Sequence, residues 1–159
     1  MKQEDINTKT ILSSLWIFVL LNIFARDIHE LGRPGMLEQI MSGVIDGVTI
    51  TEELMLLGGI MIEIPILMVL LSRVLHYKIN RWANIIAGAL AIAIVVMSNL
   101  KPDLDNIFFM VIEFLALIAV ICIAWKWKWQ VKNKKLIQQN LNAHVHVRRG
   151  FLYGERKDV

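Results

Sequence analysis

Two glutamates, Glu63 and Glu113, each interrupt a run of apolar residues long enough to cross a lipid bilayer. An ionised side chain near the centre of a transmembrane helix costs about 2.5–3.5 kcal/mol on insertion scales. Ionisable groups in such helices therefore bind protons, ions or polar ligands, or pair with other polar groups of the bundle. These two carboxyl groups are the first candidates for chemistry in the chain.

Other polar side chains are expected at a similar depth. The helical rise places Glu63 about 13–14 Å and Glu113 about 9 Å below the outer ends of their helices, and Asn22 about 7 Å below Asp27. The simplest arrangement gathers these groups around one cavity open to the outer side, because lipid would leave each unsatisfied. The ligand-binding residues predicted from this arrangement are Asn22, Arg26, Asp27, Glu63, Asn99 and Glu113.

Two structural arrangements compete with an exchangeable site. Pro65 lacks the N–H that would bond the carbonyl of Met61, so the helix is expected to kink beside Glu63, and a protonated Glu63 would need to donate only one hydrogen bond. Arg26, if it reaches inward, would form a buried salt bridge with either glutamate and fix the helix register.

The elements that position these residues are helices. Of the 159 residues 56% are hydrophobic, and charges avoid four stretches, predicted as spans over residues 11–27, 54–74, 82–100 and 107–125. These runs are apolar on all sides, unlike the amphipathic helices of a soluble bundle. The prediction is an all-α integral membrane four-helix bundle over residues 1–129, followed by a basic cytoplasmic tail over residues 130–159.

The outer loop between the first two spans holds its own helical pattern. After Pro34 and Gly35, apolar residues recur at helical spacing over residues 36–45. They predict a short interfacial helix on the membrane surface or over the bundle mouth, with an ordinary packed loop helix as the alternative. Thr49 and Thr51 are the two candidate caps for the second span.

Small residues mark where helices are expected to approach closely. Gly58 and Gly59 lie in the second span, and alanines at four-residue spacing lie beside Gly88 in the third, at positions 83, 87 and 91. Small side chains let backbones approach in lipid, so these positions are predicted to be packing contacts.

The distribution of basic residues predicts the orientation. Fourteen of the 17 lysines and arginines lie at the termini and in the loop between spans two and three, and three lie on the other side. Because positive residues favour the cytoplasmic side, both termini are predicted to be cytoplasmic, in a bacterial inner membrane.

No cofactor and no metal site is expected. His144 and His146 have no third ligand nearby in the sequence, and no nucleophile, metal triad or cofactor motif supports catalysis, so the chain leans away from being an enzyme. The basic tail suits anionic lipid headgroups, and nothing indicates nucleic-acid binding. The expected partners are membrane lipids, a small-molecule ligand and further copies of the chain.

The polar residues at fixed places in these apolar helices resemble a bacterial family of small four-span membrane proteins, catalogued as a domain of unknown function. The resemblance covers about residues 7–128 and rests on residues 15–22, 27–28, 63–65, 70–74, 81–88 and 112–113. It implies the same fold and points to Asp27, Glu63, Pro65, Arg81, Asn84 and Glu113, but implies no activity, substrate or cofactor. The layout is more distantly similar to the DoxX-like membrane proteins, in architecture alone.

Three functions remain compatible with the sequence. The first is binding or transport of protons or of a small cationic or amphipathic ligand at an intramembrane polar site. The second is a structural or assembly role in which the polar groups join helices. The third is a lipid-modifying enzyme of the isomerase type, with one carboxyl group as acid and the other as base.

Overall fold

The computed structural model describes residues 3–98 and 104–154, with the side chains of residues 6–97, 104–127 and 137–139. The elements in chain order are α1 (Gln3–Leu31), α2 (Met36–Ser42), β1 (Val44–Ile45), β2 (Val48–Thr49), α3 (Glu52–Val74), α4 (Tyr77–Ser98) and α5 (Leu104–Gly154). Four stretches are long and apolar enough to cross a membrane: Ile6–Leu31, Glu52–Val74, Tyr77–Met97 and Leu104–Trp127. The predicted all-α architecture with four membrane-competent helices is confirmed.

The chain divides into two compact units, Met1–Ala124 and Trp125–Val159. The first contains the helix bundle and every described residue of the candidate site. The second contains the later part of α5, which is helical to Gly154.

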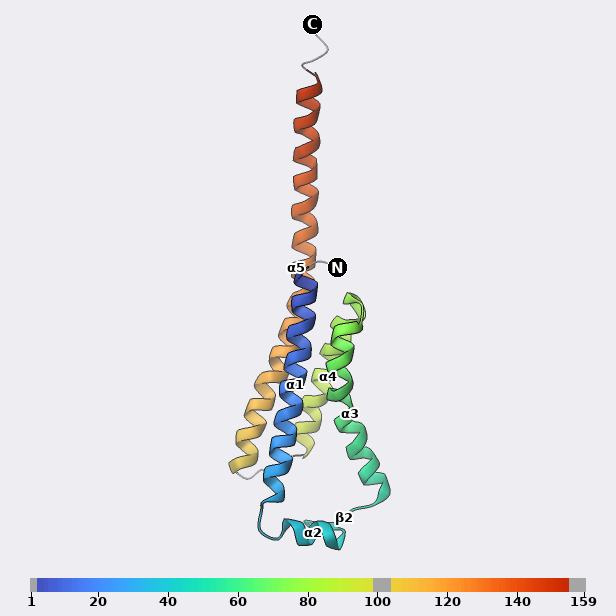
Figure 1. Cartoon of the computed structure of the whole chain (residues 1–159), viewed down its shortest axis with the longest axis vertical. Helices are drawn as coiled ribbons and strands as arrows, with labels where there is room; N and C mark the ends of the chain where they lie inside the picture. Colours follow the sequence, from blue (N-terminus) through green and yellow to red (C-terminus); the bar gives the residue numbers. More distant parts are fainter. Residues whose placement is uncertain (1–2, 99–103, 155–159) are drawn as a thin grey trace. The chain divides into compact units, whose positions relative to one another are not determined.

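The bundle of the first unit has two distinct ends. The connection formed by α2 and the β1–β2 hairpin closes one end, here named the α2 end, and the chain begins at the other, named the N-terminal end (Figure 1). Helices α1 and α3 diverge towards the α2 end (Figure 1). Their hydrogen bonds to each other lie nearer the N-terminal end, where the Ser13 hydroxyl donates to the Val69 carbonyl at 2.8 Å.

The first turn of α3 is fixed by a threonine cap. The Thr51 hydroxyl oxygen accepts the N–H of Leu54 at 3.3 Å, which satisfies one of the open donors of the helix start. Of the two predicted caps Thr51 is the one used, because Thr49 belongs to β2. The helix continues through Pro65, which is buried.

The loop helix α2 is present but shorter than predicted. It ends at Ser42, because Gly43 adopts a left-handed conformation with φ 74° that terminates the helix. Val44 and Ile45 pair instead with Thr49 and Val48 in an antiparallel hairpin. The two turn residues, Asp46 and Gly47, have φ 48° and 81°, as a tight two-residue hairpin turn requires.

Helix packing confirms one of the two predicted small-residue contacts. A Cβ added to Gly88 of α4 would lie 2.9 Å from Cγ1 of Ile121 in α5, so this glycine permits the close approach of the two helices. Gly58 and Gly59 of α3 have no atom within 4 Å of such a Cβ. The prediction that they form a packing contact was wrong, because they face open space.

Candidate functional site

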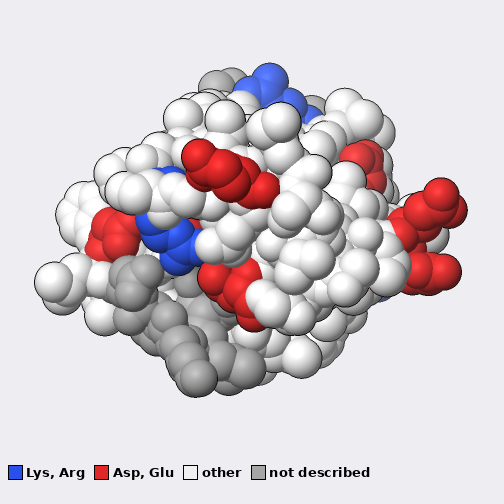
Figure 2. Space-filling model, turned by 90° about the horizontal axis from the view of Figure 1, so that it is seen from below, with Lys and Arg blue, Asp and Glu red and all other residues white. Residues whose placement is uncertain are grey.

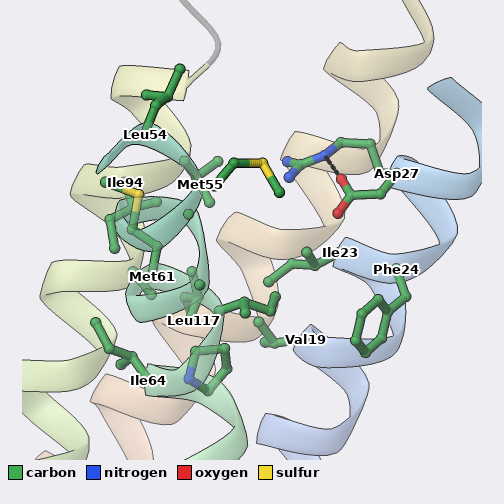
Figure 3. Close-up of a pocket in the computed structure, with 17 residues that line it drawn as sticks. Val19, Ile23, Phe24, Asp27, Leu54, Met55, Met61, Ile64, Ile94 and Leu117 are labelled. Atoms are coloured by element: carbon green, nitrogen blue, oxygen red, sulfur yellow. Dashed lines mark ion pairs between the residues drawn. The ribbon is translucent and has the colours of Figure 1, made fainter. Parts of the chain in front are cut away.

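A cavity of about 560 Å³ lies between α1, α3, α4 and α5 in the half of the bundle nearer α2 (Figure 3). Its wall is almost entirely apolar, with two charged residues from the last turns of α1. The lining residues are Val19, Ile23, Phe24, Arg26, Asp27, Leu54, Met55, Gly58, Gly59, Met61, Ile62, Ile64, Pro65, Ala91, Ile94, Val95 and Leu117.

The cavity exists because the first half of α3 lies apart from its neighbours. Every residue from Thr51 to Ile60 is exposed, whereas Pro65 and Met68 in the second half are buried. Gly58 and Gly59 contribute no side chain to fill the space. Protein interiors otherwise pack closely, with few voids larger than a water molecule, so an opening of this size is a notable departure.

The polar part of the cavity wall is an ion cluster that joins α1 to α5. Nη1 of Arg26 lies 3.1 Å from Oε2 of Glu113, and Nε of Arg26 lies 3.6 Å from Oδ1 of Asp27. The exposed fractions of the side chains are 0% for Glu113, 16% for Arg26 and 59% for Asp27. Asp27 therefore lies at the open side of the cluster, and Glu113 behind it.

Two buried polar atoms near this cluster have no hydrogen-bond partner among the described residues. They are Oε1 of Glu113, the carboxylate oxygen that Arg26 does not bond, and Nδ2 of Asn22, one helical turn from Arg26. An unsatisfied buried donor or acceptor costs about 1–3 kcal/mol. The cluster is thus held in an incompletely satisfied state, as is frequent at functional sites.

A second polar group, of buried residues nearer the N-terminal end, is hydrogen-bonded throughout. Oδ1 of Asn84 accepts from Nε1 of Trp16 at 2.7 Å and from the Ser72 hydroxyl at 3.1 Å. Nδ2 of Asn84 donates to the carbonyl and the side-chain oxygen of Asn80 at 2.9 and 2.7 Å, and Nδ2 of Asn80 donates to the Ser72 carbonyl at 2.6 Å. This network joins α1, α3 and α4 and leaves no atom of the Asn84 amide open.

Two basic residues extend the contact between α1 and α3 towards the N-terminal end of the bundle. Nε of Arg73 donates to the Ser13 hydroxyl at 3.0 Å, and Nζ of Lys9 lies 3.4 Å from the Arg73 carbonyl. Sequence reasoning did not select Trp16, Ser72 and Asn80 as site residues. The available signal was the four-residue spacing of Asn80 and Asn84 in an otherwise apolar helix, which places both amides on one face.

Glu63 lies apart from both polar groups. It is exposed on α3, and it is absent from the cavity wall, to which its neighbours Ile62 and Ile64 belong. The helix turns its carboxyl group away from the cavity, so the expected meeting of Glu63 with Glu113 does not occur in the described structure.

Most of the surface at the α2 end is uncharged, and the charged side chains in view are mainly acidic (Figure 2). Arg33 contacts Oε1 of Glu30 at 2.9 Å and Oδ2 of Asp46 at 3.5 Å, and His29 lies 3.4 Å from Asp105. Among the described residues no group of three His, Cys, Asp or Glu side chains is placed to hold a metal ion.

The structure thus separates the seven predicted site residues. Arg26, Asp27 and Glu113 form the ion cluster, and Asn22 is half-buried one turn away. Asn84 belongs to the closed network, and Glu63 is on the exposed face of α3. Asn99 lies outside the described residues.

Comparison with known proteins gives a family without an assigned activity. One family model, described as a family of unknown function, DUF6326, matches residues 1–134. No curated protein and no solved structure matches the chain.

Proposed function

The chain belongs to the family of unknown function DUF6326, and from its geometry we propose that it binds an amphipathic small molecule in the cavity between α1 and α3. The observation that carries the proposal is an apolar cavity of about 560 Å³ with Arg26 and Asp27 in its wall, where Arg26 is paired with Glu113 behind it. Small-molecule sites are typically apolar cavities of about 300–1,000 Å³ with a few polar groups that orient the ligand.

The apolar wall accommodates the body of the ligand. Met55, Met61 and Ile94 from α3 and α4 face Ile23 and Val19 from α1 across the space (Figure 3). Methionine side chains adapt to ligands of different shapes because they are flexible and polarisable. An alkyl or isoprenoid chain matches this lining.

The head group would contact the two charged residues of the wall. Asp27 is the more exposed of the two and accepts hydrogen bonds, whereas Arg26 is already engaged by Glu113. The cluster contains two carboxylates and one guanidinium, and its net negative charge favours a cationic or hydroxylated head group over an anionic one. This is the amphipathic ligand class expected from the sequence, and of the predicted contacts Asp27 and Arg26 line the cavity whereas Glu63 does not.

We further place the binding site on the outer side of a bacterial inner membrane, with both termini cytoplasmic. The fourteen basic residues at the termini and the α3–α4 connection support this orientation. The cavity would then open towards the outer leaflet, from which an amphipathic molecule partitions into the bundle.

The buried network around Asn84 favours a structural role for that half of the molecule. Its members satisfy one another and lie away from the cavity wall. Interhelical hydrogen bonds of this kind hold helices in register in a membrane. We therefore propose that ligand binding and helix registration occupy opposite halves of the bundle.

The test is photolabelling of the full chain in lipid nanodiscs. Three diazirine-bearing probes share a twelve-carbon chain and differ in a trimethylammonium, a glycerol ether or a phosphate head group. We expect saturable labelling of peptides that contain Met55, Met61 and Ile94, strongest with the cationic probe and weakest with the phosphate.

Matched variants distinguish cavity binding from partition into lipid. Gly59→Leu places a side chain into open space and should reduce labelling at least fivefold without disturbing protein contacts. Ala89→Leu adds the same bulk on the exposed side of α4 and should leave labelling unchanged. Labelling that is unsaturable, or that Gly59→Leu does not reduce, contradicts the proposal.

A further inference from the structure

A row of exposed side chains runs along the face of α3 opposite the cavity. Its members, named here the α3 seam, are Leu56, Ile60, Glu63, Leu67, Leu70 and Val74, all of them exposed. None belongs to the cavity wall. Their spacing alternates between four and three residues, which is the heptad spacing of the contact positions between two parallel helices.

Glu63 is the one ionisable residue among the six members of the α3 seam. It is the twelfth of the 23 residues of α3, so it lies about 16 Å from either end of the helix. A hydrocarbon core is about 30 Å thick, so Glu63 is near its middle, beyond the reach of lipid headgroups and bulk water. Its carboxyl group therefore requires a protein partner within the membrane.

The exposed positions at the same depth on the other helices offer no such partner. Most are apolar: Ile17, Phe18 and Leu21 on α1, Ile86 and Leu90 on α4, and Leu115 and Ile118 on α5. The exposed Ser14 of α1 lies nearer the N-terminal end. Among the described exposed residues near mid-depth, Glu63 is the one carboxylic acid, so Glu63 of a second copy is the partner of matching depth and chemistry. A twofold axis brings identical positions together.

We propose that a second copy of the chain binds along the α3 seam, with the two Glu63 carboxyl groups hydrogen-bonded to each other across a twofold axis. Two carboxyl groups in contact in low dielectric share a proton, because both cannot remain ionised. A single polar residue in an apolar heptad seam fixes the register and the number of strands, so Glu63 would select a parallel dimer.

Disulfide cross-linking in native membranes tests the geometry. In a Cys122→Ser background, Leu56→Cys and Leu67→Cys should form disulfide-linked dimers on oxidation. Ile86→Cys on α4 and Leu115→Cys on α5, which are equally exposed, should cross-link at least tenfold more slowly. Equal rates, or faster cross-linking at the α4 or α5 positions, would overturn the proposed interface.

Association measured by energy transfer in vesicles tests the role of Glu63. Glu63→Leu should weaken association about 3- to 30-fold, the range expected for an interhelical hydrogen bond in lipid, whereas Glu63→Gln retains a donor and an acceptor and should associate like the unmodified chain. Glu38→Leu removes an exposed glutamate on α2, outside the seam, and serves as the matched control. A chain that stays monomeric at all protein-to-lipid ratios, or a Glu63→Leu variant that associates normally, contradicts the proposal.

The seam and the cavity can be tested separately. Gly58→Leu fills the cavity on the side of α3 opposite the seam and should reduce photolabelling while leaving association unchanged, and Glu63→Leu should leave photolabelling of the cavity unchanged. The experiments can therefore contradict ligand binding in the cavity and dimerisation along the seam independently of each other.

Discussion

Arg26 of α1 and Glu113 of α5 lie 87 positions apart in the sequence and are joined by an ion pair of 3.1 Å between Nη1 and Oε2. The carboxyl group is fully buried and the guanidinium is nearly so. This contact connects the first and last helices of the bundle at the edge of the cavity. Of the two partners that the sequence offered for Arg26, the structure selects Glu113.

Removal of either partner of this pair should destabilise the bundle more than removal of both. Glu113→Leu leaves Arg26 without its buried partner, and Arg26→Met leaves the carboxylate; each should cost about 3–5 kcal/mol, and the double variant should recover much of the loss. The unfolding free energies of the unmodified chain, the two single variants and the double variant in mixed micelles give the coupling free energy between Arg26 and Glu113. As a control, the more exposed Arg33–Glu30 pair should contribute at most about 1 kcal/mol. Additive losses at Arg26 and Glu113 would show that the two residues do not act as a pair.

Asn84 and Asn22 should respond in opposite ways to the same substitution. Asn84→Leu leaves the Trp16 N–H and the Ser72 hydroxyl without their acceptor and should cost about 1–3 kcal/mol. Asn22→Leu removes an amide nitrogen that has no partner among the described residues and should be neutral or stabilising. Unfolding free energies in the same micelles compare them directly. Equal losses at the two positions would contradict the division of the bundle into a satisfied half and an open half.

Gly88 and Gly59 can be compared to test where the bundle has room for a larger side chain. Gly88→Leu drives a side chain into Ile121 and should destabilise the α4–α5 contact by about 1–3 kcal/mol. Gly59→Leu meets no atom within 4 Å and should leave stability unchanged or raise it by up to about 1 kcal/mol, since leucine favours helices over glycine. Thermal unfolding measures both, and a larger loss for Gly59→Leu would mean that the cavity closes in the membrane.

The proposed orientation predicts which residues are accessible from outside the cell. In the Cys122→Ser background, Met41→Cys on α2, where the native side chain is 84% exposed, should react with a membrane-impermeant maleimide added to intact cells. Lys78→Cys at the start of α4 should react only after the membrane is permeabilised. The reverse pattern of reactivity would invert the topology.

Much of the fold follows directly from the sequence. The four apolar runs and the close approach at Gly88 follow from local patterns, and Thr51 was one of the two caps that the sequence predicted. The hairpin after α2 was not predicted from the sequence. Val44 and Ile45 continue the apolar spacing of the helix, and only the left-handed Gly43 interrupts it. The Asp46-Gly47 pair is a typical hairpin-turn sequence and favours a hairpin over a continued helix.

The sequence predicted which polar residues lie in the helices but not which of them the fold brings together. In a membrane helix nearly every position is apolar, so the hydrophobic pattern does not fix the rotation of the helix about its axis. For this reason the depth of Glu63 in the membrane could be predicted by counting residues along the helix, whereas the side of the helix on which it lies could not. Asn84 was included through the family resemblance, and its hydrogen bond to Trp16 was not predicted because Trp16 was counted as an apolar residue.

The position of the cavity has a consequence for how the molecule responds to compression. The cavity lies in the half of the bundle where α3 lies apart from α1, and the hydrogen-bonded group around Asn84 lies away from its wall. Hydrostatic pressure favours states that eliminate voids. Its effect should therefore fall on the first half of α3 and press it towards α1, so that the protein has a state of smaller volume in which one half closes and the other keeps its register.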